Sequence, residues 1–164
     1  MPRHRLLLVC ALLLGGCATF PFSPARVPAG ASRADVERAM GPPTAVYTMP
    51  DGHERLEYHH MPAGRQTFMV DLDAAGHMAR WENVLDENHF AAIVPGMTRG
   101  DVLRLIGPPS FTSHYWRPTP GITWLYRWQS PLRCVVFEVS FDAASGRVLE
   151  GDYPPDPGCP DEYH

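Results

Sequence analysis

The feature that most constrains the fold is an internal repeat. Residues 29–43, AGASRADVERAMGPP, and residues 95–109, PGMTRGDVLRLIGPP, align without a gap at a spacing of 66 residues. Self-similarity at a fixed spacing indicates a structural unit that the chain uses more than once. The sequence therefore predicts two related units in tandem.

Each copy of the repeat predicts a short helix with a defined start and end. Ser32 and Thr98 are good N-cap residues, and an Asp follows each of them by three positions. Between cap and end, apolar residues recur at i, i+3 and i+4, which is typical of a helix with one buried face. Gly41 and Gly107 suit the end of the helix, and the two prolines after each glycine prevent its continuation.

Strand patterns follow each predicted helix. Residues 55–58 precede residues 67–81 in the first copy, and residues 123–128 precede residues 135–151 in the second. Apolar residues alternate with other residues in these segments, as expected for a sheet with one buried face. The sequences DAAG and DAASG mark hairpin turns at matching places. Each copy therefore predicts a helix and three antiparallel strands.

The predicted fold class is α+β. It has two tandem repeats, each with one or two short helices packed on a three-stranded antiparallel sheet. Asp86 can cap an additional helix that runs roughly to Ile93. We therefore expect repeat 1 over residues 29–85, repeat 2 over residues 86–153, and a Pro-rich tail over residues 154–164.

The N-terminus has the features of a secretory signal. Arg3 and Arg5 precede a short apolar run, which is shorter than the roughly 20 residues that cross a membrane. The sequence Leu-Gly-Gly-Cys that ends at Cys17 resembles a bacterial lipobox, in which the cysteine is lipidated after cleavage. This resemblance implies a signal peptide over residues 1–16 and a lipidated Cys17 followed by a tether through residue 28. The alternative is an ordinary secreted protein with an incidental cysteine.

The charge balance argues against nucleic acid as a partner. Removal of residues 1–16, which hold two Arg and no acidic residue, leaves 12 Arg against 18 acidic residues, a formal charge of −6. Nucleic-acid binding depends on basic patches that neutralise phosphates, and this chain has no basic run.

The four cysteines divide into two groups. Cys10 leaves with the signal and Cys17 is the expected lipidation site, so Cys134 and Cys159 remain. In an oxidising periplasm two remaining thiols favour a disulfide, with two free thiols as the alternative.

No motif indicates catalysis, a metal or a cofactor. His59 and His60 are adjacent, so on a strand they would point to opposite faces and could not easily share a metal ion. Asp71, Asp73 and Asp142 lie beside turns, and turn chemistry explains them better than paired acid–base carboxylates. The sequence therefore favours a protein that is not an enzyme.

Aromatic residues are the best candidates for binding. Trp124, Tyr126 and Trp128 share one face of a predicted strand, where packing beneath the helix is the simpler explanation. Tyr115 and Trp116 precede that strand in a segment that we expect to be a loop. Aromatic residues are enriched at interaction hot spots, so Tyr115 and Trp116 are the predicted partner-binding residues.

The order of elements carries a family resemblance. A helix over DENHFAAI, the segment VPGMTRGDVLRLIGPP, an aromatic strand, an alternating strand and FDAASGRV occur in sequence. This order resembles the SmpA/OmlA domain of BamE-like outer-membrane lipoproteins. Residues 86–153 match well, whereas residues 28–85 lack a clear leading helix. BamE-like proteins have one such domain, and two in tandem are similar to the architecture of beta-lactamase inhibitor protein.

The resemblance implies a lipoprotein that is anchored in the outer membrane and faces the periplasm, because Ala18 stands where inner-membrane retention uses Asp. It implies a non-catalytic scaffold or accessory for envelope integrity or outer-membrane protein assembly, with barrel-assembly components as candidate partners. The alternative is an inhibitor or binding module for a periplasmic or secreted enzyme, which a concave aromatic surface formed by both sheets would favour.

Substitution of Cys17 tests the anchor directly. We expect Cys17→Ala to abolish lipid modification and to remove the protein from the membrane fraction, as measured by intact mass and fractionation. The matched variant Cys10→Ala should keep the lipid modification and the presence in the membrane fraction, because Cys10 is removed with the signal. Lipidated Cys17→Ala protein in the membrane fraction would show that the lipobox assignment is wrong.

Overall fold

The structure is a computed structural model that describes residues 23–60, 64–116, 120–131 and 134–159. The helices and strands fall into two groups along the chain, and in each group the helices come before the strands. In chain order they are the 3-10 helix η1 (Pro24–Arg26), α1 (Arg33–Met40), β1 (Ala45–Thr48), β2 (Glu54–His59), β3 (Thr67–Leu72), β4 (Met78–Asn83), α2 (Glu87–Ala91), α3 (Arg99–Ile106), β5 (Phe111–Tyr115), β6 (Gly121–Tyr126), β7 (Phe137–Asp142) and β8 (Val148–Asp152).

Each repeat contains an antiparallel sheet of four strands, not the three that the sequence predicts. The strand orders are β1-β2-β3-β4 in the first sheet and β5-β6-β7-β8 in the second. The additional strands, β1 and β5, lie at the edges of their sheets and are exposed or half-buried along their whole length. An edge strand that buries little has no alternating apolar pattern, so the sequence signal for it is weak.

The predicted repeat is confirmed in the positions of the helices. The helices α1 and α3 begin and end at a constant spacing of 66 residues, and their N-caps accept hydrogen bonds from the backbone amides of Asp35 and Asp101. The residue at each N-cap also bridges to the residue before the last strand of its repeat, as Ser32 to His77 and as Thr98 to Arg147. The two copies therefore have the same helix-to-sheet connection.

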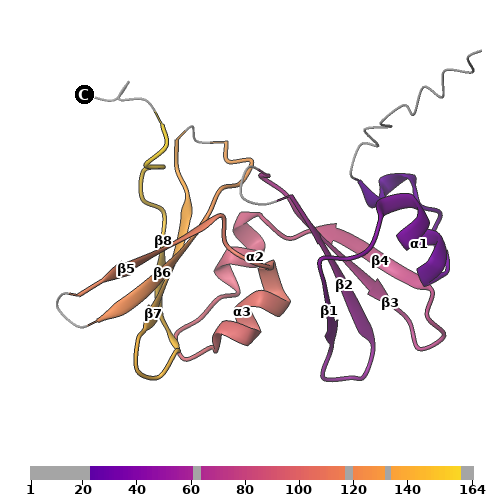
Figure 1. Cartoon of the computed structure of the whole chain (residues 1–164), viewed down its shortest axis with the longest axis horizontal. Helices are drawn as coiled ribbons and strands as arrows, with labels where there is room; N and C mark the ends of the chain where they lie inside the picture. The colour runs from indigo at the N-terminus through magenta and orange to yellow at the C-terminus, as the bar shows by residue number, and fades with distance from the viewer. Residues whose placement is uncertain (1–22, 61–63, 117–119, 132–133, 160–164) are drawn as a thin grey trace, which may run out of the picture.

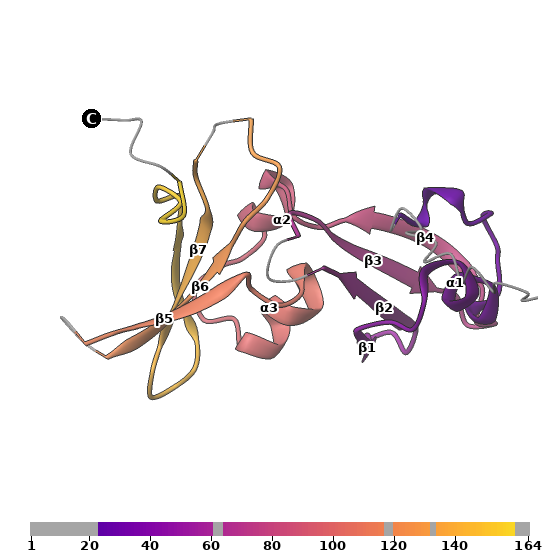
Figure 2. The same ribbon diagram turned by 45° about the horizontal axis from the view of Figure 1, so that its top comes forward.

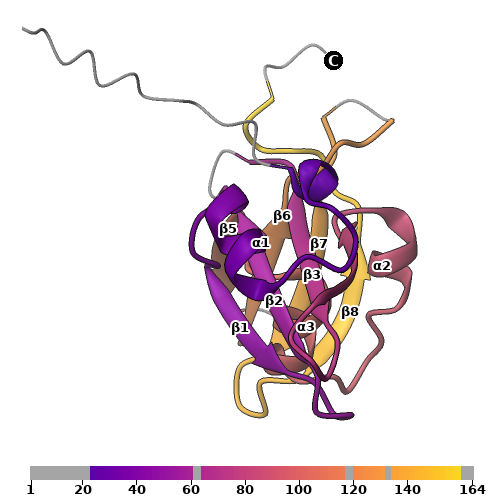
Figure 3. The same cartoon turned by 90° about the vertical axis from the view of Figure 1, so that its right-hand side faces the viewer.

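The elements form a stack of alternating helical and sheet layers (Figure 1). The helix α1 covers one face of the first sheet, as the view along the stack shows (Figure 3). The helices α2 and α3 lie between the two sheets (Figure 2). The sequence predicts each helix on its own sheet, but α3 serves its own sheet and also covers the back of the preceding one.

The first sheet consequently has two covered faces. All six residues of β3 are buried, because alternate residues face α1 and the α2–α3 layer. Phe68, Val70 and Leu72 join the core with α1, whereas Met69 joins the core with α2 and α3. A strand that is covered on both faces has no exposed side, so the polar residues of β3, Thr67 and Asp71, are buried as well.

The N-terminal end of the described chain packs against the first repeat. Of the expected tether, Ser23 caps η1 and Val27 is buried, and two residues after the tether the amide of Gly30 donates to the carbonyl of Met78 at 3.1 Å. Residues 23–28 are therefore part of the fold. The expected signal peptide (1–16), Cys17 and the rest of the tether (17–22) lie outside the described residues.

The predicted disulfide between Cys134 and Cys159 is present and holds the C-terminal segment. The amide of Asp156 donates to the carbonyl of Cys134 at 2.7 Å. Arg127 donates two hydrogen bonds to the carboxylate of Asp156 at 2.8 and 2.9 Å. The hydrogen bonds from Arg127 hold the pKa of Asp156 below its ordinary value despite burial. The first part of the predicted tail is thus packed on repeat 2.

Matched glycines test the contact of α3 with the first sheet. Gly41 and Gly107 both have a positive φ, 84° and 75°, in a region that costs other residues about 1–3 kcal/mol. A Cβ at Gly107 would lie 2.9 Å from the Cγ2 of Thr67, whereas a Cβ at Gly41 would meet nothing. We expect Gly107→Ala to reduce the free energy of unfolding by about 1–3 kcal/mol more than Gly41→Ala, as measured by urea denaturation. Equal losses would contradict this contact.

Candidate functional site

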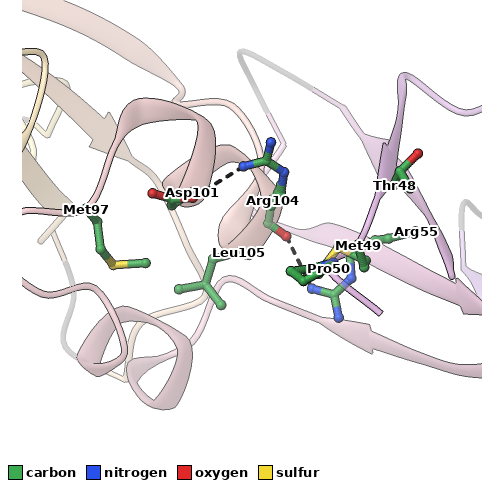
Figure 4. Close-up of a pocket in the computed structure, with 8 residues that line it drawn as sticks. All are labelled: Thr48, Met49, Pro50, Arg55, Met97, Asp101, Arg104 and Leu105. Atoms are coloured by element: carbon green, nitrogen blue, oxygen red, sulfur yellow. Dashed lines mark hydrogen bonds and ion pairs between the residues drawn. The ribbon is translucent and has the colours of Figure 1, made fainter. Parts of the chain in front are cut away.

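A cleft of about 490 Å³ lies where the two repeats meet. One wall comes from the turn after β1 and from β2, and the other wall comes from α3 and the segment before it (Figure 4). The lining residues are Thr48, Met49, Pro50, Arg55, Met97, Asp101, Arg104 and Leu105. Methionine, leucine and proline give the cleft an apolar surface, and none of the described residues that line it is aromatic.

Arg55, one of the residues that line the cleft, belongs to a buried ion pair on the first sheet. Arg55 donates from Nε and Nη2 to the two carboxylate oxygens of Asp71 at 2.6 and 2.9 Å. Its Nη1 donates to the carbonyl of Arg104 at 3.2 Å. That carbonyl belongs to the last turn of α3, where helical carbonyls lack partners within the helix. Arg55 therefore joins the first sheet to the helix of the second repeat.

The charge state of Asp71 follows from these neighbours. Burial raises the pKa of Asp71, but the hydrogen bonds and the charge of Arg55, with the charge of Arg80, bring this pKa below its ordinary value. The Nε of Arg80 lies 2.7 Å from the second oxygen of Asp71. Asp71 is thus a stable carboxylate with two cationic partners.

A second buried carboxylate, Glu57, lies on the same face of the first sheet and is 2 % exposed. It accepts hydrogen bonds from the hydroxyl of Tyr47 at 2.6 Å and from the hydroxyl of Thr44 at 2.8 Å. The Nδ1 of His59 lies 2.8 Å from the same carboxylate. Burial, together with Glu57, raises the pKa of Tyr47 far above its ordinary value, so the phenol remains a donor.

The hydrogen-bond partners of Asp71, Asp73 and Asp142 show which of these residues belong to turns, as the sequence predicts. Asp73 and Asp142 accept hydrogen bonds from amides of their own turns, as predicted. The assignment of Asp71 to turn chemistry is wrong, because Asp71 is a buried strand residue in an ion pair. Sequence reasoning alone does not find Arg55 and Glu57 as interface residues. Their signal is the alternation of these two charged residues with the apolar Leu56 and Tyr58 in β2.

The histidines are dispersed. His53 lies beside Asp51 in the turn between β1 and β2, and His59 contacts Glu57. Within the described ranges, no three His, Cys, Asp or Glu residues are grouped so that they could hold a metal ion.

The predicted partner-binding residues have different surroundings. Tyr115 is the last residue of β5, so the expectation that it lies on a loop is wrong. A Cβ at Gly121, its partner in the register, would lie only 2.0 Å from the ring of Tyr115, so this ring covers the glycine. Trp116 follows the strand and is 77 % exposed.

The aromatic residues on β6 and after it belong to the core. Tyr126 and Trp128 are buried beneath the helices, and Trp124 packs against the same core with its ring centroid 4.7 Å from that of Phe141. The hydroxyl of Tyr126 donates to the carbonyl of Gly107 at 3.1 Å. The prediction that these three aromatic residues pack in the core is therefore confirmed.

Comparison with known proteins identifies no relative. No protein-family model matches the chain, and no curated protein or solved structure matches it significantly. None of the helices in the described part of the chain has the length and apolarity that a membrane crossing requires.

The ion pair of Arg55 and Asp71 provides a stability test of the junction. We expect Asp71→Asn to cost about 3–5 kcal/mol at neutral pH, because the buried guanidinium of Arg55 loses its bidentate counter-ion and keeps, among the described carboxylates, only Glu82, at 3.5 Å. The double variant Arg55→Met/Asp71→Leu should be less destabilised than Asp71→Asn. The measurement is the free energy of unfolding in urea.

The control and the pH dependence sharpen this test. Asp35→Asn breaks an exposed pair with Arg38 and should have little effect. Because the pKa of Asp71 is lowered in the fold, its contribution is present above the unfolded carboxyl pKa of about 4 and is lost on acidification. The difference between the wild type and Asp71→Asn should therefore shrink below about pH 4. A difference that does not depend on pH would contradict the assignment.

Proposed function

We propose that this protein is a lipid-anchored lipoprotein of the outer membrane that faces the periplasm and acts as a non-catalytic scaffold or accessory. The process it serves is envelope integrity or outer-membrane protein assembly. The observation that carries the proposal is a twice-used unit, a capped helix on an antiparallel sheet, behind an N-terminal lipobox.

The order of elements supports kinship with SmpA/OmlA domains. Repeat 2 has two helices, α2 and α3, followed by its sheet, which is the order that the resemblance implies. Repeat 1 has the short helix η1 in place of a leading α-helix. The tandem arrangement and the disulfide distinguish this chain from BamE-like proteins with one domain, so the proposal concerns the class of role rather than an identical role.

The chemistry of the junction favours a structural role over catalysis. Arg55 directs its polar atoms toward Asp71 and α3, and the carboxylate of Glu57 accepts hydrogen bonds from the hydroxyls of Tyr47 and Thr44. In the wall of the cleft, Arg104 lies 3.3 Å from Asp101, which itself caps α3. Catalytic groups need partners that converge on a space where substrate can bind, whereas these charges are already paired.

The disulfide supports an oxidising compartment, because such bonds persist mainly outside the cytosol. The enzyme-inhibitor alternative depends on a concave aromatic surface shared by both sheets. In the structure, α2 and α3 occupy the space between the sheets, and the cleft is lined by methionine and arginine rather than by aromatic residues. We therefore do not propose the inhibitor role.

Crosslinking in intact cells tests the proposed role. A tagged, lipidated chain would be crosslinked, purified under denaturing conditions and analysed for its companions by mass spectrometry, with Cys17→Ala as the matched control. We expect barrel-assembly or other envelope components, and we expect the control to lose them because it leaves the membrane. Recovery of a single soluble enzyme, with both forms, would overturn the proposal in favour of an inhibitor.

A further inference from the structure

Both α1 and α3 begin with an arginine, Arg33 and Arg99, and the two arginines have different environments. In repeat 1, the Nε of Arg33 lies 2.8 Å from Glu37, one turn later on α1. Its Nη1 lies 2.7 Å from Glu54 at the start of β2. The hydrogen bond that Arg33 donates to Glu37 is the main reason that the pKa of Arg33 is raised. Repeat 1 thus shows what an arginine at this position binds, which is a pair of carboxylates.

Repeat 2 keeps the arginine, as Arg99, but lacks both glutamates. The helix position that matches Glu37 at the spacing of 66 residues is Leu103. The strand register shows which residue of repeat 2 matches Glu54. Leu56 pairs with Val70 in repeat 1, and Trp124 pairs with Val139 at the equivalent place in repeat 2. Two positions before Leu56 is Glu54, and two positions before Trp124 is Ile122. Both carboxylates are therefore replaced by apolar side chains.

The guanidinium of Arg99 lies instead against an aromatic ring. Its central carbon is 5.6 Å from the centroid of Phe141, and its Nε is buried without a hydrogen-bond partner in the described part of the chain. The described residues also include no ion pair to Arg99. An arginine over an aromatic face can still donate through its remaining N–H groups.

Apolar side chains surround this arginine on the face of the second sheet that α3 covers. Trp124 contacts Phe141 and is half-buried, and Ile122 is half-buried on the same face. On the neighbouring strand, His114 of β5 pairs with Ile122, so the two residues share this face. We infer that the exposed Trp116, two residues after His114, continues the alternation of β5 onto the same face. We call this set of residues, Arg99, Leu103, Trp116, Ile122 and Trp124, the Arg99 surface.

We propose that the Arg99 surface binds an acidic segment of a protein partner, whose carboxylate takes the place that Glu37 and Glu54 occupy beside Arg33. This inference rests on the proposed role as a partner-binding lipoprotein. Arginine and tryptophan are the residue types most enriched at binding hot spots, and a bidentate pair with a carboxylate is strong.

A protein segment is favoured over lipid headgroups because the anchor enters at the other end of the molecule. The described chain begins at Ser23, which belongs to η1 beside α1 (Figure 1). Only five residues, 18–22, separate Ser23 from the proposed anchor at Cys17, so the two residues lie at most about 20 Å apart. The membrane is therefore close to repeat 1, whereas the Arg99 surface belongs to repeat 2.

Site-specific photocrosslinking of the full-length lipidated chain in intact cells tests this inference. A photoreactive amino acid replaces Trp116 in one strain and the exposed Leu149 of β8 in another. We expect adducts from position 116 that map to an Asp- or Glu-containing segment of a protein. Combined with Arg99→Gln, the yield at position 116 should fall about tenfold or more, since loss of a buried charge partner costs that much.

Two further variants separate binding from folding. Leu103→Glu supplies the intramolecular carboxylate that Arg33 has in Glu37, so it should reduce the adduct about as much as Arg99→Gln while thermal unfolding shows an intact fold. Arg33→Gln removes the equivalent arginine of repeat 1 and should leave the adduct unchanged.

The remaining outcomes distinguish this inference from the proposed function. Protein adducts from position 149 but not from 116, or adducts at 116 that Arg99→Gln and Leu103→Glu do not reduce, would overturn the Arg99 surface and leave the accessory role standing. Adducts from position 116 to lipid would show a membrane contact instead. Absence of protein adducts at both positions, together with no companions in general crosslinking, would overturn the proposed function as well.

Discussion

The contact between Arg55 and α3 is the interaction on which the arrangement of the two repeats depends. The guanidinium satisfies Asp71 on the first sheet and a carbonyl in the last turn of a helix that belongs to the second repeat. Without that helix, the back of the first sheet would expose Met69 and leave Arg55 and Glu57 without their cover. One helix thus completes two sheets, and burying the charged groups is tolerable because each of them has a partner.

The sequence predicts the local structure of each repeat well because the relevant signals are local. The caps at Ser32 and Thr98, the glycine ends and the DAAG and DAASG turns all depend on residues within one or two turns of the chain. The edge strands β1 and β5 escape prediction since they bury little. The position of α3 between the sheets escapes it for a different reason: an amphipathic pattern indicates that a helix has a buried face but does not specify which sheets cover it.

The candidate sites show the same limit. The pairing of Cys134 with Cys159 follows from elimination among four cysteines, and the structure contains it. Tyr115 looks exposed in sequence, but its ring covers Gly121, a contact that depends on strand register. The difference between Arg33 and Arg99 is visible in the sequence at Glu37 and Leu103, yet its meaning requires knowing that Glu54 and Ile122 occupy equivalent places. Register between strands is a long-range property that a single sequence does not reveal.

The disulfide has a consequence for the end of the chain. Cys134 and Cys159 enclose β7 and β8 in a closed covalent ring, and the two cysteines have a sequence separation of 25. Chain termini are normally where folded domains fray first and where exopeptidases begin. Here the last strand cannot leave the sheet by peeling away from its end, because the ring returns it to the beginning of β7. The ring thus protects the final hairpin kinetically against unfolding that starts from the C-terminal side.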